Sequence, residues 1–137
     1  MNNKSSEFNS VIVQNTYIAR KEIIRLCHYL ESHLEDKIKL SKMEKISGLS
    51  SRSLQYGFRK YFGCSPCKWL QNKRLIAAMN KLNFSDEKFN VTSIIYDFGF
   101  SNGSTFSKYY KQKFGERPSI SLSRNKNRNS HLKIHSV

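Results

Sequence analysis

The amino-acid sequence predicts an all-α protein that contains two similar helical units. Apolar residues in the longer segments recur every three or four positions, as on one face of a helix, and few runs alternate with the two-residue period of a strand. Two stretches of the 137-residue chain also share one pattern of apolar residues, glycines and prolines. A chain of this length fits one domain or two small subdomains, and the repeat favours two.

The first predicted helix lies within residues 18–36, after a polar arm or linker at residues 1–17. Its apolar residues form a single stripe: Ile23, Leu26, Cys27, Leu30 and Leu34. A second long helix is predicted over residues 68–82, because apolar residues again recur at helical spacing. Pro66 precedes it, at a place where a helix can begin.

The organisation that follows has two subdomains and a tail. We place the first subdomain at residues 18–66, a linker helix at 67–82 and the second subdomain at 83–124. Residues 125–137 are polar and basic without an acidic side chain, which predicts a disordered tail. This tail either is only solvated or adds nonspecific contacts to phosphates.

The internal repeat begins at Leu40 in the first copy and at Val91 in the second. Each copy starts with a short amphipathic segment that ends at a glycine, Gly48 or Gly99. A second segment follows, and its apolar residues match in pairs: Leu54 with Phe106, Phe58 with Tyr110, and Phe62 with Phe114. The copies close on Gly63 and Gly115, then on Pro66 and Pro118. The offset grows by one residue between the segments, so the second turn is one residue longer.

Each copy has the order of a helix-turn-helix motif, which is a short helix, a glycine turn, a polar residue and a second helix. Gly48 and Gly99 can adopt the left-handed conformation that ends the first helix. Ser50 can cap the second helix of the first copy, and Ser101 or Asn102 that of the second. The second helices, at about residues 51–62 and 103–114, are therefore predicted to be recognition helices.

The composition is strongly basic, with 24 Lys and Arg against 10 Asp and Glu and a formal net charge of +14. Such a charge indicates a polyanionic partner, and by itself it leaves DNA, RNA and an anionic membrane surface open. No apolar run of about 18 residues is present to span a membrane. An odd number of cysteines, three, argues against a disulfide framework and for a reducing compartment. We expect a cytoplasmic, nucleoid-associated protein that does not bind membranes.

The predicted recognition helices supply the expected DNA contacts. Arg and Gln read guanine and adenine through paired hydrogen bonds in the major groove, and the first turn of a recognition helix reaches the bases. We therefore expect base reading by six residues: Arg52, Gln55, Tyr56, Ser104, Thr105 and Lys108. Four others are expected at the sugar–phosphate backbone: Ser51, Arg59, Gly103 and Lys111. Two alternatives remain: Arg52 could bind a phosphate instead of a base, and Tyr56 could pack against the protein instead of contacting a base.

The two blocks after the turns resemble the AraC/XylS family of bacterial transcription regulators. The resemblance covers residues 18–124 and is most specific at Gly63, Pro66, Trp69, Arg74 and Ala78, and at Gly99, Phe106, Lys108, Gly115 and Pro118. Residues 66–70 and 117–122 look most similar to regulators of ethanolamine-use operons. The resemblance implies a fold of seven helices in two homeodomain-like subdomains. It also implies double-stranded promoter DNA and RNA polymerase as partners, and activation of transcription as the function. It also places Arg52, Gln55 and Tyr56, and Gly103, Ser104, Thr105 and Lys108, where the family contacts DNA.

Three departures from the family pattern affect these expectations. Glu44 and Ile95 stand where the family usually has a small residue, which predicts looser or shifted helix packing. Gly57 lies inside the first recognition helix, where glycine costs about 1 kcal/mol relative to alanine, and we expect it to allow a backbone to approach closely. Residues 103–105 have short side chains, so we expect the second unit to bind mostly the DNA backbone.

Other functions have weaker support in the sequence. Cys64 and Cys67 have the spacing of a redox pair or of half a zinc site. His131 and His135 could supply two further zinc ligands. A structural turn nevertheless fits Cys64 and Cys67 better. Trp69 is expected in the core rather than as a stacking platform. We expect no enzyme activity, metal or cofactor, because no catalytic set is visible, and we expect a monomer on DNA. Nonspecific nucleic-acid binding by a nucleoid-type protein, and a DNA-binding part of a larger effector-responsive regulator, remain alternatives.

Overall fold

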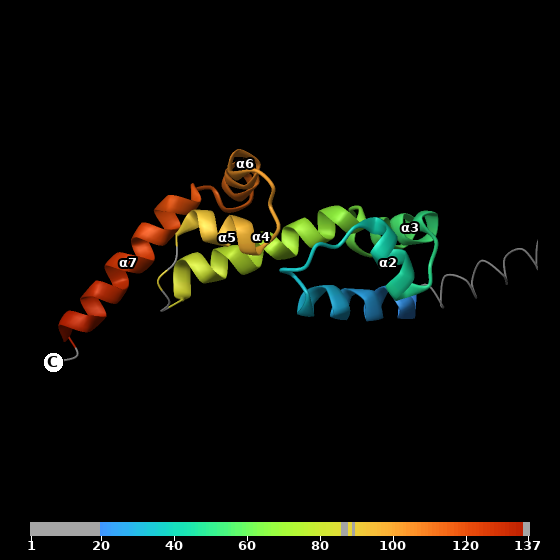
Figure 1. Cartoon of the computed structure of the whole chain (residues 1–137), viewed down its shortest axis with the longest axis horizontal. Coiled ribbons are helices and arrows are strands. Elements are labelled where there is room, and N and C mark those ends of the chain that lie inside the picture. Colours follow the sequence, from blue (N-terminus) through green and yellow to red (C-terminus); the bar gives the residue numbers. More distant parts are fainter. Residues whose placement is uncertain (1–19, 86–87, 89, 136–137) are drawn as a thin grey trace, which may run out of the picture. The chain divides into compact units, whose positions relative to one another are not determined.

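The computed structural model describes residues 20–85, 88 and 90–135. These residues form seven helices and no strand (Figure 1), which confirms the predicted all-α fold. A first helix includes residues 20–32, and the others are α2 (Leu40–Ser47), α3 (Ser51–Phe62), α4 (Pro66–Phe84), α5 (Val91–Asp97), α6 (Gly103–Phe114) and α7 (Pro118–His135). No helix in the described part of the chain is long and apolar enough to cross a membrane. The predicted arm at residues 1–17 lies outside the described residues.

The chain divides into two compact units. Of the described residues, the N-terminal unit contains those from residue 20 to His33 together with Ile38–Gln71, and the C-terminal unit contains Leu34–Lys37 together with those from Asn72 onward. Helix α4 occupies the region for which a linker helix was expected, and the boundary between the units falls within it. Its two parts each contribute buried side chains to one unit, so α4 is part of both cores.

The core of the N-terminal unit brings together side chains from every helix of that unit. The buried residues are Ile23, Leu26 and Leu30 from the first helix, Met43 from α2, Leu54 and Phe58 from α3, and Trp69 and Leu70 from α4. The ring of Trp69 meets the ring of Phe58 edge-on, with 5.9 Å between centroids. Trp69 is therefore a core residue, as the sequence predicts.

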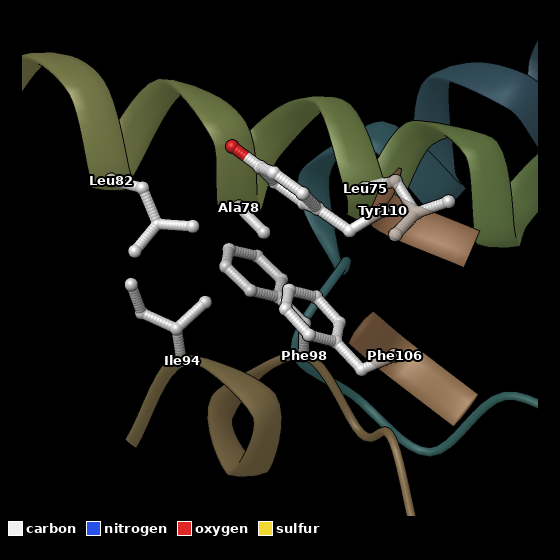
Figure 2. Close-up of a cluster of buried hydrophobic side chains, with 7 residues drawn as sticks. All are labelled: Leu75, Ala78, Leu82, Ile94, Phe98, Phe106 and Tyr110. Atoms are coloured by element: carbon white, nitrogen blue, oxygen red, sulfur yellow. The ribbon is translucent and has the colours of Figure 1, made fainter. Parts of the chain in front are cut away.

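The core of the C-terminal unit is a cluster of aliphatic and aromatic side chains (Figure 2). Helix α4 supplies one side of the cluster, while α5, its C-cap and α6 supply the other. The members are Leu75, Ala78, Leu82, Ile94, Phe98, Phe106 and Tyr110. Phe106 and Tyr110 come from one face of α6, so this packing leaves the opposite face of α6 exposed.

The first helix is shorter than the sequence predicts. Its apolar stripe extends to Leu34, but the helix ends at residue 32. The guanidinium of Arg74 donates to the carbonyl oxygen of Leu34 at 2.9 Å and to that of Asp36 at 2.5 Å. These bonds satisfy backbone groups that a continued helix would use, and the side chain of Leu34 packs against the core of the C-terminal unit. A tertiary contact therefore overrides the local helical pattern.

Residues 125–135 form the last turns of α7 instead of the predicted disordered tail. Two contacts hold the beginning of this segment. The Asn125 amide donates to the carbonyl oxygen of Ser85 at 3.0 Å, and the Arg128 guanidinium lies 5.6 Å from the centroid of the Phe84 ring. The low hydrophobicity of the segment suggested disorder, but polar and cation–π contacts to the end of α4 order it.

Gly57 allows a side chain, and not a backbone, to approach α3. A Cβ atom at this position would meet Cδ1 of Ile23 and would lie 3.4 Å from Cγ1 of the same residue. Ile23 is fully buried, so its side chain has little room to move. The expectation of a close backbone approach is therefore corrected: the glycine accommodates the first helix through Ile23.

Gly57→Ala is expected to lower the free energy of unfolding by about 1–2 kcal/mol. Overpacking costs about 1–3 kcal/mol, and the better helix propensity of alanine returns up to about 1 kcal/mol. Chemical denaturation followed by circular dichroism measures the change. In the double variant Gly57→Ala/Ile23→Val, which lacks the Ile23 Cδ1 atom, part of the loss should be recovered.

Gly103→Ala is the matched control for this experiment. Its Cβ would lie 3.6 Å from Cδ1 of Ile95, which is an ordinary contact, and Gly103 is exposed in the first turn of α6. This variant should be neutral or more stable than the wild type. Equal effects of alanine at both glycines would contradict the packing of Ile23 on Gly57.

Candidate nucleic-acid interface

The turn between α2 and α3 is fixed by three local features. Gly48 has a left-handed φ of 74°, and its N–H donates to the carbonyl oxygen of Glu44 at 2.8 Å. The Ser47 hydroxyl accepts the N–H of Leu49 at 3.1 Å. The Ser50 hydroxyl caps α3 by accepting the N–H of Ser53 at 3.2 Å, as the sequence predicts. Together these bonds set where α3 begins.

The first helix also holds the end of α2. The guanidinium of Arg25 donates to the carbonyl oxygens of Ile46 and Ser47, at 3.4 and 3.3 Å, and pairs with the carboxylate of Glu22. A cation at the C-terminus of a helix also interacts favourably with the helix dipole. This arrangement fixes the direction in which the turn and α3 leave α2.

The turn between α5 and α6 repeats this design with one more residue. Gly99 has a left-handed φ of 71°, and α6 begins four residues after it, whereas α3 begins three residues after Gly48. The Asn102 side chain caps α6 by accepting the N–H of Ser104 at 2.8 Å. The structure therefore confirms the longer second turn and assigns the cap to Asn102, not to Ser101.

The exposed face of α3 carries long polar and aromatic side chains. The predicted contact residues Arg52, Gln55, Tyr56 and Arg59 are all exposed, and Ser51 is half-buried. They follow the helical spacing of three and four residues that places side chains on one face. Tyr56 is 66% exposed, so it does not serve the core of its own unit. Lys60, four residues after Tyr56, belongs to the same face and was missed, although its spacing indicates it.

The exposed face of α6 carries shorter side chains in its first turn. Gly103, Ser104, Thr105, Lys108 and Lys111 are all exposed, as expected from the sequence. Gln112 is also exposed, and the i, i+4 spacing from Lys108 could have identified it. With an offset of 52 residues, Ser104 takes the place of Arg52, Lys108 that of Tyr56, and Lys111 that of Arg59.

Ile95 takes up space that the family pattern leaves to a small residue. Its side chain packs against the core of the C-terminal unit, and its Cδ1 would lie 3.6 Å from a Cβ atom added at Gly103 of α6. Glu44, the other unusual residue, is half-buried on α2. At Ile95, a larger residue on α5 therefore meets a smaller one on α6.

The electrostatics of both exposed faces are strongly positive. No acidic residue occurs between Glu44 and Asp86, a stretch that contains all of α3 and α4, or between Asp97 and Glu116, a stretch that contains all of α6. Basic side chains near the C-termini of α3 and α6 also complement the helix dipoles. Such faces attract an anionic partner and repel a cationic one.

A buried hydrogen-bond network connects α6 to α7. The Tyr110 hydroxyl donates to the Ser121 hydroxyl at 2.7 Å, and Ser121 donates to the Glu116 carboxylate at 2.7 Å. Arg124 pairs with the same carboxylate. The hydrogen bond from Ser121, followed by the one from Arg124, holds the pKa of Glu116 below its ordinary value, while burial raises the pKa of Tyr110. The network therefore fixes α6 against α7 with Glu116 ionised.

Glu116 is expected to make the stability of the protein depend on pH. Its pKa is lower in the folded than in the unfolded protein, so its contribution is complete above the unfolded-state pKa and disappears as the pH falls through the folded-state pKa. Urea denaturation across the acidic range should show the wild type's advantage over Glu116→Gln shrinking as the pH falls. Ser121→Ala should weaken this dependence, and a pH-independent difference would contradict it.

The cysteines lie at the junction of α3 and α4. Cys64 is half-buried in the turn, Cys67 is exposed in the first turn of α4, and both are free thiols. Among the side chains that the structure describes, no group of three His, Cys, Asp or Glu residues could hold a metal ion.

Comparison with known proteins identifies the family of this double helix-turn-helix arrangement. The sequence profile of a family described as a helix-turn-helix domain matches residues 43–123, which is more than half of the chain. A solved structure of a probable AraC family transcriptional regulator from Rhodopseudomonas palustris matches with a TM-score of 0.72 and 30% identity, covering 77% of this chain and 97% of that one. The chain belongs to the AraC/XylS family.

Curated relatives of this AraC/XylS family member are longer proteins. The "XylDLEGF operon transcriptional activator 3" of Pseudomonas putida is 32% identical over 105 residues, covering 74% of this chain and 31% of the relative. The "Probable thc operon regulatory protein" of Rhodococcus erythropolis is 35% identical over 102 residues, covering 73% and 31%. The chain therefore spans about a third of the length of these relatives.

A further solved structure shows the same fold as this family member. The DNA-binding domain of AdpA, solved in complex with a target DNA, matches with a TM-score of 0.69 at 20% identity, covering 77% of this chain and 94% of that one. At this identity, the match supports the shared AraC/XylS fold alone.

Proposed function

We propose that this chain binds double-stranded DNA through the exposed faces of α3 and α6. The observation that carries this proposal is the repetition of one arrangement in both units. Each recognition helix begins at a side-chain cap, buries aromatic and aliphatic residues on one face, and exposes an acid-free face with basic residues. A helix presented in this way fits the major groove, which is about 12 Å wide.

The proposed roles divide along each helix. Six residues within the first two turns read base edges: Arg52, Gln55, Tyr56, Ser104, Thr105 and Lys108. Four others bind the sugar–phosphate backbone: Ser51 and Gly103 at the helix N-termini, and Arg59 and Lys111 further along the helices. This division follows the general rule that the N-terminal part of a recognition helix meets the bases, while contacts to phosphates fix the register.

The two units contribute unequally in this proposal. The first turn of α3 exposes Arg52, whose guanidinium can form two hydrogen bonds with guanine. The equivalent residue of α6 is Ser104, which has a short side chain with a single hydroxyl. We infer that α3 carries most of the sequence preference and that α6 mainly anchors the protein through Lys108 and Lys111.

The proposed biological role is regulation of transcription at promoters. Its support is that relatives of similar sequence are named operon activators and that the domain of the AdpA structure was solved with a target DNA. We propose that the chain acts as the DNA-binding part of such a regulator, that it activates transcription by contacting RNA polymerase, and that it binds DNA as a monomer.

Selection from a random duplex pool tests DNA recognition directly. The protein should enrich one sequence pattern, because specific sites bind about 10³-fold or more tightly than random duplex at moderate salt. The alternative function, nonspecific binding by charge, predicts equal affinity for the selected and scrambled duplexes. Equal affinities at a defined salt concentration would therefore overturn the proposal.

A further inference from the structure

The C-terminal part of α7 extends beyond the region that the family shares. The family profile ends at residue 123, whereas α7 continues to His135. Figure 1 shows α7 as one helix whose last turns continue past α5 and α6 of the same unit. Residues 124–135 contain four Lys and Arg and no acidic residue. This extension lies beyond the residues that the family profile matches.

The side chains of this extension are arranged by helical position. The buried positions face the unit, at Ser121 and Asn125. Exposed Arg124 and Arg128, one helical turn apart, lie on one flank of this buried line. Exposed Lys126 lies on the other flank. Basic residues therefore occupy both flanks of the helix.

Between residues 123 and 130, the outward ridge between the two flanks carries short polar side chains. Ser123, Asn127 and Ser130 are all exposed there. Side chains of this size allow another surface to approach the helix axis closely, and their hydroxyl and amide groups can donate hydrogen bonds to phosphates. An α-helix is about 10–12 Å in diameter, so long basic side chains on its flanks can reach the two phosphate chains that border a groove.

The extension is also held in position. The Asn125 amide bonds to the backbone of Ser85, and Arg128 stacks on the ring of Phe84. A segment that served only to keep the protein soluble would need neither contact. The contacts order the basic residues before a partner binds, which lowers the entropic cost of binding.

We propose that residues 123–130 of α7 form a second DNA-contacting surface, which lies along a groove beside the site of α6. Arg128 binds phosphates on one side of this groove and Lys126 binds phosphates on the other, while Arg124 keeps its ion pair with Glu116. The proposal rests on the proposed DNA binding by α3 and α6, and it assigns to α7 affinity without sequence preference.

The salt dependence of binding to the selected duplex tests this surface. Each lost phosphate contact reduces the slope of log K against log salt by about 0.9. The variant Lys126→Gln/Arg128→Gln should therefore have a slope shallower by about 2, with the same preferred sequence. Hydroxyl-radical footprinting should show that protection is lost only at one end of the bound site.

Two control variants separate this role from general charge and from folding. Arg20→Gln/Lys21→Gln removes the same charge from exposed residues elsewhere and should leave the slope unchanged. Lys126→Arg/Arg128→Lys keeps the charge and should keep the wild-type slope. Far-UV circular dichroism checks that each variant retains its helices.

The outcomes distinguish the two proposals. If the wild type prefers the selected duplex but the α7 variant has the wild-type slope, the proposal that α7 contacts DNA is overturned, while the proposed function stands. The positive charge of α7 would then suit an acidic protein partner instead. Equal slope changes in the α7 variant and the charge-matched control would also overturn the proposal for α7. If the wild type itself shows no preference for any duplex, the proposed function fails first.

Discussion

Phe106→Ala is expected to lower the free energy of unfolding by about 3–5 kcal/mol. The Phe106 side chain is fully buried and belongs to the cluster in Figure 2, where it lies beside Phe98. Its ring meets Phe100 edge-on at 4.9 Å between centroids and lies 5.7 Å from the ring of Tyr110. Removing it leaves a cavity among residues of α4, α5 and α6, and these helices cannot all move to fill it.

A loss of this size threatens the fold, because small domains are typically stable by only about 5–15 kcal/mol. Denaturation followed by circular dichroism measures the loss, and hydrogen exchange should show the fastest amides in α5, α6 and α7. Tyr96→Ala is the matched control, since Tyr96 is 84% exposed on α5 and exposed substitutions usually change stability by less than about 0.5 kcal/mol. A loss below about 1 kcal/mol in Phe106→Ala would show that α6 does not pack as described.

Local rules predicted the helix-turn-helix units well. A glycine that ends a helix, a polar cap and a repeated set of apolar positions are all encoded within a few residues. The left-handed conformations of Gly48 and Gly99, the Ser50 cap and the longer second turn therefore agree with expectation. The exposed faces of α3 and α6 follow from the same periodicity.

Features that depend on distant residues could not be predicted in this way. The first helix ends early because Arg74, forty residues further along, binds the carbonyl oxygen of Leu34. The tail is helical because Asn125 binds Ser85, also forty residues away. The role of Gly57 depends on the position of Ile23 in another helix. Sequence periodicity contains no information about such pairs.

The candidate site also has a part that local sequence patterns predict and a part that they do not. Periodicity identifies which side chains of α3 and α6 point away from the core, and chemistry indicates which of these suit bases or phosphates. In the proposed complex, the base that each residue would contact depends on the orientation of the helix on the DNA, which periodicity does not encode because it records only which side chains share a face. Variants that separate base reading from phosphate binding therefore provide the decisive measurement.

Arg52→Ala is expected to weaken binding to the selected duplex by about 1–3 kcal/mol and to relax the preference at one base position. Arg52 lies in the first turn of α3 and is exposed, so the substitution should leave the fold intact. The planar guanidinium can form two parallel hydrogen bonds with O6 and N7 of guanine, and alanine can form neither. Repeating the selection with the variant identifies the base position that loses its preference.

Two further substitutions decide whether Arg52 reads a base or clamps a phosphate. Arg52→Lys keeps the charge but loses the forked geometry, so a base-reading Arg52 should not be rescued by lysine, whereas a phosphate clamp should be. Arg59→Ala, two turns further along α3, is the matched comparison. It should weaken binding to all sequences equally and reduce the salt slope by about 0.9. If Arg52→Ala behaves like Arg59→Ala, and lysine restores binding at position 52, then Arg52 binds the backbone and α3 reads DNA through Gln55 and Tyr56.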